Sequence, residues 1–414
     1  MTLGSHTAPN PRRVLLTATF GAFLVGLDSM VVIPLISTIA TATDIEPRLG
    51  GLFVSAYALL FAVFAPLFGA MSDRLGRRKV LTMGLATFAI ANALTGLGTS
   101  FEFLLACRAL AGLGGAMIMP SAYAMISDTY PFEQRGKVMG IVVAGLLSST
   151  VFGVPLGSYL AYLTSWQAVF FVIAVVAALI CVLVFALLPV MASPAAQQGT
   201  KTNPLKAYVG MLRRAVTTPA VLFVLGCTLL WSSALYGMFS NIGVFYSERF
   251  GLNEAQIGLT IMASGTGSMI GALTGGRIAD RVGKRTVIVV AALVAAAGVT
   301  AVPQLGENLV PVLIAFVLWG TAVGVGQPCL NALISELRPE TRGTALALNS
   351  TALYGGMMLA TSLAAVLLER GVSFEVIGAA CGVCALLVLP LLIGVRVAVG
   401  SVAVGSVVLG GAGK

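Results

Sequence analysis

Long apolar runs recur along the whole chain and are separated by short polar segments. Most of them reach the ~20 residues that an α-helix needs to cross ~30 Å of hydrocarbon. Polar and apolar residues do not alternate within a run, as they would in the strands of a membrane barrel. The pattern predicts twelve transmembrane helices, at 14–40, 51–70, 80–98, 103–126, 138–162, 167–189, 219–246, 255–276, 286–304, 309–334, 343–368 and 374–396.

The composition excludes an ordinary soluble domain. Apolar residues make up 58% of the chain and charged residues only 9%, whereas soluble domains carry about 25% charged residues. In water such a chain would expose far more apolar surface than it could bury. We therefore expect an all-α integral membrane protein that lies in a lipid bilayer.

The distribution of positive charge predicts the topology. If both termini are cytoplasmic, all but four of the 24 Lys and Arg residues fall in cytoplasmic segments. The exceptions are Arg48, Arg249 and Arg370 in outer loops and Arg108 within a helix. This is the asymmetry of the positive-inside rule, so the net charge of +9 reports topology and does not indicate a nucleic-acid partner. We expect a multi-pass protein of a bacterial inner (cytoplasmic) membrane.

Residues for metal or covalent chemistry are scarce. The one histidine, His6, lies in the N-terminal tail, and Cys381 and Cys384 form a CxxC within an apolar helix. Neither arrangement favours a metal site, since metal ligands need to converge. No nucleophile–base constellation or soluble catalytic domain is present, which argues against an intramembrane enzyme and against a receptor without transport. We expect no cofactor and no metal.

The sequence contains an internal duplication. GAMSDRLGRRK (69–79) returns as GRIADRVGKRT (276–286), with Asp73 and Asp280 207 positions apart, and Glu133 returns as Glu340 at the same offset. Two unrelated motifs that each recur after the same number of residues indicate a duplicated six-helix unit, as is typical of secondary transporters. The predicted organisation is a first bundle, a cytoplasmic linker, a second bundle and a low-complexity tail, at 1–189, 190–217, 218–396 and 397–414.

Four motifs resemble the major facilitator superfamily over essentially the whole chain. The loop at 69–79 is similar to its signature between helices 2 and 3, and RALAGLGGA (108–116) to the helix-4 motif of its proton-coupled members. GVPLGSYLA (153–161) resembles the helix-5 motif of its exporters, and LDSMVV (27–32) the first-helix acid of drug:proton antiporters. The resemblance implies a twelve-helix, alternating-access exporter of small drug-like or metabolite molecules, of the kind that gives multidrug resistance. Departures from the helix-5 pattern at Val154 and Ser158 favour an alternative, the efflux of sugar or nucleoside-type metabolites.

The duplicated loops are predicted to form a conformational latch. An acid among basic residues could dock on the free N-terminus of a helix in the other bundle, through the helix dipole. We expect Asp73 to dock where helix 11 begins near Arg342, and Asp280 to dock on helix 5 near Arg135, in the outward-open state. The alternative is that the basic loops only fix topology. The latch candidates are Gly69, Asp73, Arg74, Gly76, Arg77, Asp280, Arg281 and Gly283.

Asp28 and Arg108 are the deeply embedded charges. Asp28 lies about 22 Å along helix 1 from its inner edge, where a charged form costs roughly 2.5–3.5 kcal/mol on insertion scales. Burial favours the protonated form of a carboxyl, so Asp28 is our candidate for exchanging a proton for cargo. Arg108 could pair with it or tune it. The alternatives are a purely structural ion pair, or a break in helix 1 near Pro34 that Asp28 caps.

Further polar, aromatic and small residues within the spans complete the candidates. Gly145, Gly153, Pro155 and Gly157 lie along helix 5 and predict either a bendable interface or ordinary tight packing. The cargo-cavity candidates, each of which could equally be helix–helix contacts, are Tyr57, Tyr123, Trp231, Tyr236, Asn241, Gln327, Asn331, Asn349 and Tyr354. The second half has no deeply embedded charge, so neutral or cationic cargo fits better than anionic cargo. We expect a monomer that rocks between states, which the duplicated layout favours over a channel.

Overall fold

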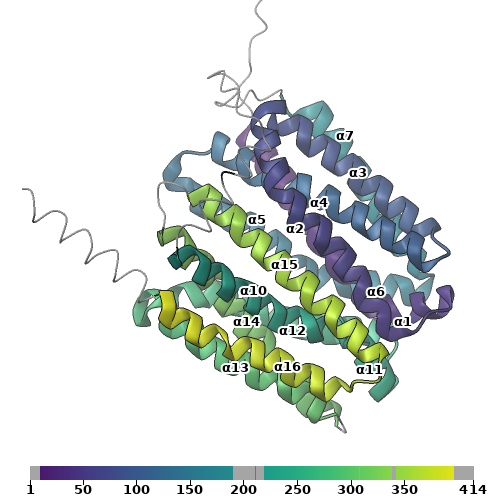
Figure 1. The fold of residues 1–414 in the computed structure, drawn as a ribbon. Coiled ribbons are helices and arrows are strands. Elements are labelled where there is room, and N and C mark those ends of the chain that lie inside the picture. Colours follow the sequence, from purple (N-terminus) through teal and green to yellow (C-terminus); the bar gives the residue numbers. More distant parts are fainter. Residues whose placement is uncertain (1–9, 190–209, 211–218, 307, 338–341, 396–414) are drawn as a thin grey trace, which may run out of the picture.

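Long helices in two groups make up the computed structural model of this protein (Figure 1). The structure describes all residues except 1–9, 190–209, 211–218, 307, 338–341 and 396–414. Within this described part, twelve helical spans are long and apolar enough to cross a membrane, and no strand occurs. The first half contains α1 (Pro11–Thr43), η1 (Pro47–Gly50), α2 (Gly51–Leu75), α3 (Arg77–Leu97), α4 (Phe101–Thr129), α5 (Phe132–Ser148), η2 (Ser149–Gly153), α6 (Val154–Leu163) and α7 (Trp166–Leu187). The second half contains α10 (Pro219–Phe239), α11 (Ile242–Phe250), α12 (Glu254–Val282), α13 (Lys284–Gln304), α14 (Leu309–Leu337), α15 (Arg342–Glu369) and α16 (Phe374–Leu386).

The twelve predicted spans are confirmed, but not all of them are single α-helices. The fifth span changes at Ser149–Gly153 into a turn of π-helix, η2, directly before Pro155. Proline lacks an N–H and clashes with the preceding turn, which accounts for a local widening of the helix at this point. The seventh span breaks between α10 and α11 at Ser240 and Asn241.

The duplication predicted from sequence is visible in the backbone. Gly76, which separates α2 from α3, has φ 94° and ψ 135°, and Gly283, which separates α12 from α13, has φ 90° and ψ 137°. A positive φ is costly for any residue with a Cβ, so both turns require glycine. The two pseudo-symmetric six-helix bundles are thereby confirmed. The predicted linker, apart from Gly210, and the predicted tail lie outside the described residues.

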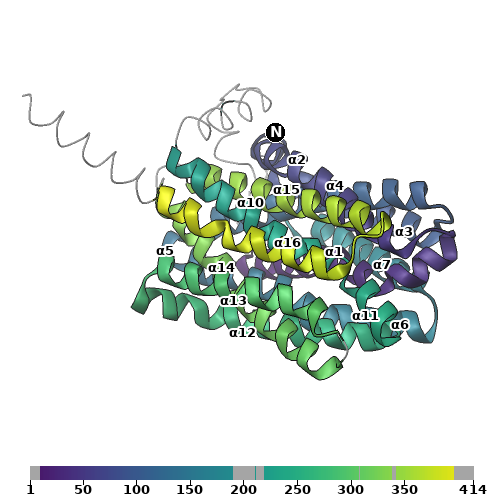
Figure 2. The same ribbon diagram turned by 60° about the horizontal axis from the view of Figure 1, so that its bottom comes forward.

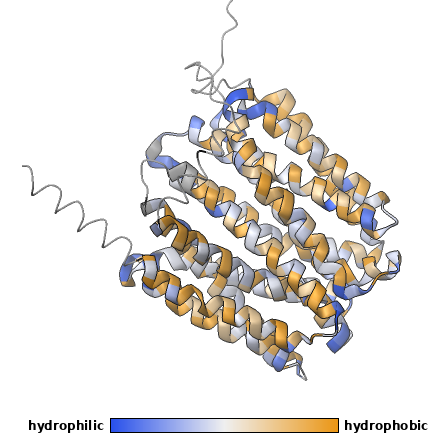
Figure 3. Cartoon of the chain, viewed as in Figure 1, coloured by the Kyte–Doolittle hydropathy of each residue, from blue (hydrophilic) through white to orange (hydrophobic). Residues whose placement is uncertain are grey.

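The two ends of the helical assembly differ in charge. We call the end where α1 begins and where α2 and α12 end the basic end; its described turns carry most of the Arg and Lys residues. We call the opposite end the acidic end; it carries Asp44, Glu46, Glu102, Glu248, Glu254, Glu369 and Glu375. Figure 3 shows hydrophilic residues gathered at the helix ends and hydrophobic residues along the flanks. This distribution matches a bundle that spans a bilayer.

Contacts between the two halves concentrate in the acidic end and the centre. Arg48 forms an ion pair with Glu248 of α11 at 2.9 Å. Thr38 donates a hydrogen bond to Glu254, and the hydroxyl of Thr351 donates to the carbonyl of Ala62 at 3.3 Å near the centre. Helices α2 and α15, which make this central contact, run side by side in both ribbon views (Figures 1 and 2).

Toward the basic end the halves part. A Cβ built on Gly258 or Gly265 of α12 would lie within 3.0 Å of Ser158 or Thr150 in the first half, so the helices touch there. Among the described residues, the hydrogen bonds and ion pairs that join the two halves all lie at the acidic end or near the centre. In its described part the conformation is therefore closed at the acidic end and open toward the basic end.

Candidate functional site: a buried ion pair inside the first half

The centre of the first bundle holds an ion pair that is sealed from solvent. Arg108 of α4 donates from Nη1 to Oδ1 of Asp28 at 2.6 Å and from Nη2 to the backbone carbonyl of Asp28 at 2.8 Å. The side chains are 0% and 1% exposed for Asp28 and Arg108. Asp28 lies near the middle of α1, a helix of 33 residues, so the pair lies deep in the membrane-spanning region. Two charges buried this far are stable only because they compensate each other.

Aromatic rings hold the guanidinium from its other sides. The carbon of the Arg108 guanidinium lies 5.1 Å from the ring centre of Tyr57 on α2 and 5.9 Å from that of Phe170 on α7. These separations lie within the range of attractive cation–π contacts. The fully buried amide of Asn92 on α3 faces the same carboxylate. Five helices of the first half thus converge on one charge pair.

One oxygen of the carboxylate is left without a partner. Oδ2 of Asp28 is buried and accepts no well-formed hydrogen bond from any described residue, because the amide of Asn92, which faces the carboxylate, donates to the carbonyl of Phe88; the hydroxyl of Tyr57 likewise has no described partner. A buried polar atom without a partner is costly and calls for an explanation. A carboxyl oxygen in this position is a place where a proton can add without displacing Arg108.

The structure removes one of the alternatives that the sequence left open, the helix break, and leaves proton exchange and a purely structural ion pair as the other two. Asp28 and Arg108 pair directly. Helix α1 continues past Pro34 to Thr43, so Asp28 does not cap a break in the helix. The site that the sequence predicts is therefore assembled, with Tyr57 as a member; Asn92 and Phe170 were missed because nothing in their own sequence context marks them.

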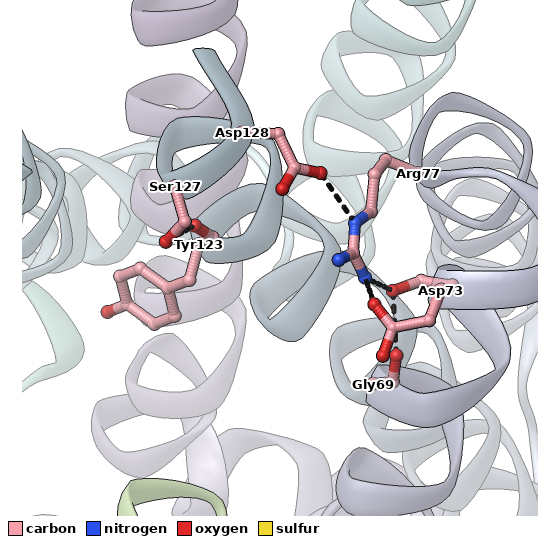
Figure 4. A network of polar contacts seen from close by, with 7 residues as sticks. Gly69, Asp73, Arg77, Tyr123, Ser127 and Asp128 are labelled. Atoms are coloured by element: carbon pink, nitrogen blue, oxygen red, sulfur yellow. Dashed lines mark hydrogen bonds and ion pairs between the residues drawn. The ribbon is translucent and has the colours of Figure 1, made fainter. Parts of the chain in front are cut away.

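The signature loop forms a second charge cluster at the basic end (Figure 4). Arg77 forms ion pairs with Asp73, one turn earlier, and with Asp128 of α4, whose Oδ2 accepts from Nε at 3.0 Å. Nη1 of Arg77 also donates to the hydroxyl of Ser72 at 2.7 Å. The loop is therefore tied to α4 of its own half. Asp128 was missed because its sequence position, at the end of a span, does not reveal a partner 51 residues away.

Among the described residues, no hydrogen bond or ion pair joins Asp73 or Asp280 to the other half, so the predicted latch is not seen in this conformation. Helix α15 begins at Arg342, as expected for a docking site. Asp73 pairs with Arg77 instead, and Arg74, Asp280 and Arg281 are exposed. Gly69 lies close to Pro120 of α4, where a Cβ would be 3.6 Å away. Docking of Asp73 and Asp280 stays a prediction for a conformation in which the basic end is closed.

The glycines of the helix-5 motif pack on α1. A Cβ on Gly145 would lie 2.7 Å from Thr19, one on Gly153 3.0 Å from Leu27, and one on Gly157 2.7 Å from Val31. This row holds the fifth span to α1 within its own half. Pro155, by contrast, approaches Gly258 of α12 in the other half. The interface between halves at this span is therefore made by Thr150, Pro155 and Ser158, which lie between or next to these glycines.

The cavity candidates separate into distinct groups. Tyr57 belongs to the ion-pair site, and Asn241 lies at the α10–α11 break, close to Gly51 of α2. Tyr354 lies at the junction of the halves, where its ring stacks on Phe61 at 3.8 Å between centroids; Tyr123 and Tyr236 are half-buried. Three others, Gln327, Asn331 and Asn349, form a hydrogen-bonded group in the second half. The indole of Trp231 packs against Gly326 beside this group.

Comparison with known proteins places this chain in a family. The family model described as Major Facilitator Superfamily matches residues 18–361, with a further match over 235–407. The uncharacterized MFS-type transporter YceJ of Bacillus subtilis (strain 168) is 30% identical over 366 residues, which cover 88% of this chain and 91% of that protein. The chloramphenicol resistance protein of Streptomyces lividans is 28% identical over 346 residues, covering 82% and 86% of the two chains.

A solved structure agrees with these sequence matches. The crystal structure of a point mutant of the nucleoside transporter NupG superposes with a TM-score of 0.73 at 13% identity and covers 92% of this chain and 99% of its own. At this identity the likeness shows the fold alone. The twelve spans, the duplicated six-helix bundles and the sequence matches lead to one conclusion: the chain is a multi-pass membrane protein that belongs to the Major Facilitator Superfamily of transporters.

Proposed function

We propose that this protein exports small drug-like or metabolite molecules across the cytoplasmic membrane in exchange for protons. Asp28 is the group that carries the proton. The observation that supports this most directly is the asymmetric carboxylate, with Oδ1 bound to Arg108 and Oδ2 buried without a described partner. An ionisable residue so deep in a membrane protein is a functional hypothesis by default.

The surroundings of Arg108 make reversible protonation of Asp28 feasible. If Asp28 takes a proton on Oδ2, the guanidinium loses its counter-charge but keeps the backbone carbonyl of Asp28 at 2.8 Å. It also keeps the ring faces of Tyr57 and Phe170. These three interactions do not depend on the charge of the carboxyl. They lower the cost of the protonated state and so allow both states to be populated.

The direction of transport follows from topology in this proposal. By the positive-inside rule the basic end faces the cytoplasm. The described conformation, open toward the basic end, is then the one that would take cargo from the cytoplasm. Closure of the basic end by the predicted latch and release of the acidic-end contacts would present the cargo outside. Protons entering from the acidic end would return the protein to the described state.

A drug-like cargo is favoured by sequence relatives. Chloramphenicol resistance and multidrug resistance proteins are among the proteins similar to this chain. The second candidate, efflux of nucleoside-type or sugar metabolites, is supported by a neutral hydrogen-bonding group of residues in the second half and by the helix-5 variant at Val154 and Ser158. The fold likeness to a nucleoside transporter adds no residue-level support.

The test is transport into inside-out membrane vesicles with an imposed pH gradient and a panel that includes chloramphenicol and lipophilic cations. The parent should accumulate cargo when the vesicle interior is acidic. Asp28→Asn should abolish this accumulation but retain cargo-for-cargo exchange without a gradient, which shows that the variant is folded. Asp28→Glu is the matched control that keeps the ionisable group. Undiminished gradient-driven accumulation by Asp28→Asn would refute the proton-carrying role.

A further inference from the structure

The amide of Asn92 on α3 is buried beside the ion pair with one of its two polar atoms unused. The residue is 0% exposed and faces the carboxylate of Asp28. Its Nδ2 donates to the backbone carbonyl of Phe88, one turn earlier in the same helix, at 3.0 Å, and its Oδ1 has no partner among the described residues. Polar atoms buried in a membrane-spanning bundle are costly, so an amide oxygen left without a donor calls for an explanation.

Contact between helices does not explain this amide. Polar side chains that hold membrane helices together bond from one helix to another, whereas the hydrogen bond seen for the Asn92 amide stays within α3. Phe88 does not depend on that bond, because its carbonyl also accepts the backbone N–H four residues later, as in any α-helix. The amide can therefore rotate at little cost about its last bond, whose torsion is broad in asparagine.

The two protonation states of Asp28 need different neighbours. As a carboxylate, Asp28 only accepts hydrogen bonds, and Arg108 already donates to its Oδ1 and to its backbone carbonyl. With a proton on Oδ2, the same side chain becomes a hydrogen-bond donor. An amide can present either its nitrogen or its oxygen to such a group, and the oxygen of Asn92 has no described partner to give up.

The other groups around the carboxylate are less suited to accept this hydrogen bond. Among the described residues, the titratable ones are Arg108 and Cys107 on α4 and Tyr57 on α2. An arginine has no acceptor, and a thiol accepts only weakly. The elements α7 and η2, which also pack on α1, contribute the neutral side chains of Phe170 and Ser149. The hydroxyl of Tyr57, which has no described partner, is the strongest competitor.

From these contacts we infer that Asn92 is a positioning residue for proton exchange: its amide oxygen accepts the hydrogen bond that Asp28 donates once it is protonated. The inference rests on the proposed proton-carrying role of Asp28 and adds the group that stabilises the protonated state. Arg108 holds the ionised carboxylate, and Asn92 holds the neutral carboxyl. Because Asn92 is fully buried, it acts through the carboxyl and not by binding cargo.

The test follows the protonated carboxyl by infrared difference spectroscopy of the purified protein in lipid, titrated with acid in the absence of cargo. A carbonyl band that is present in the parent and missing in Asp28→Asn belongs to Asp28. In Asn92→Leu this band should reach half its height at a pH about 0.5–1 unit lower, a threefold to tenfold loss of proton affinity, as expected for one lost hydrogen bond. The band should also move to higher wavenumber, because the O–H no longer donates to an amide.

A second variant and a matched control separate this role from a general packing effect. Asn92→Ser should give the same shift, because a serine hydroxyl within a helix bonds to its own backbone. Thr95→Val removes a hydroxyl that is as deeply buried, one turn later on α3, and that donates to the carbonyl of Ala91 at 2.8 Å. This control should change neither the half-height pH nor the band position. Melting temperatures show whether each variant is folded.

Three results would overturn the inference. They are an unshifted half-height pH in both Asn92 variants, a shift to higher pH, which would make Asn92 a donor to the ionised carboxylate, and a shift in Tyr57→Phe alone. Each of them leaves the proton-carrying role of Asp28 standing, provided that Asp28→Asn abolishes gradient-driven accumulation. A parent protein without any band that Asp28→Asn removes would instead overturn both the inference and the proposed function.

Discussion

Removing either partner of the buried pair should destabilise the protein, but only one of the two defects should be relieved by acid. Breaking a buried ion pair by deleting one partner costs about 3–5 kcal/mol, because the remaining charge is buried without compensation. Asp28 and Arg108 are 0% and 1% exposed, so the full range applies. The variants are Asp28→Asn and Arg108→Met.

The difference lies in what the remaining group can do. Arginine keeps its proton under all conditions in proteins, so Asp28→Asn leaves a permanent buried cation. Arg108→Met leaves a carboxyl that can be neutralised by one proton. Its folded state then binds one more proton than its unfolded state at neutral pH, so stability rises as pH falls, by about 1.36 kcal/mol per pH unit. Between pH 7.5 and pH 5.5 this recovers at most about 2.7 kcal/mol, the value reached when the folded variant stays protonated over the whole range.

The assay is thermal unfolding in mild detergent, followed by tryptophan fluorescence, with the parent measured at each pH. The melting-temperature deficit of Arg108→Met relative to the parent should shrink by several degrees on acidification, and that of Asp28→Asn should not. The double variant Asp28→Asn/Arg108→Met, which removes both charges, should be more stable than Asp28→Asn alone. A deficit of Arg108→Met that stays constant between the two pH values would refute the reasoning.

Three further predictions concern the rest of the structure. Arg48→Ala removes the ion pair to Glu248 and a cation–π contact at 5.9 Å to Phe374, which together contribute about 1–2 kcal/mol. Spin-label distances should show that the equilibrium between closed and open acidic ends shifts roughly fivefold to thirtyfold toward the open form. Arg370→Ala, the charge-matched control, should show no shift. Gly114→Ala places a methyl group 2.9 Å from the backbone nitrogen of Phe88 and should lower stability by about 1–3 kcal/mol, whereas Gly140→Ala, with nothing within 4 Å, should leave the melting temperature unchanged or raise it. Asp128→Asn should lower the melting temperature only slightly, by about 1 kcal/mol or less in stability, because Arg77 keeps Asp73 and Ser72 as partners; a loss as large as that of Asp28→Asn would contradict this.

Much of the fold could be predicted because the bilayer imposes it. Apolar runs of sufficient length become helices, and the repeated Asp-Arg-x-Gly loops reveal the duplication. Asp28 and Arg108 stand out by charge alone, since few charges lie so deep. Their partners do not: Asn92, Phe170 and Asp128 reach their sites through the packing of helices distant in sequence. The π-turn at Ser149–Gly153 depends on a competition between Pro155 and the preceding carbonyls that residue patterns do not resolve.

The position of Asp28 near the midpoint of α1 has an electrical consequence. A proton that reaches it from either face crosses about half of the transmembrane voltage, which is worth about 1.2 kcal/mol at 100 mV. On the proposed mechanism, an energised membrane would load Asp28 from outside about sevenfold more readily than a depolarised one, even with equal pH on both sides. The membrane voltage and the pH difference would then both drive protonation of the same carboxyl group, and either could substitute for the other.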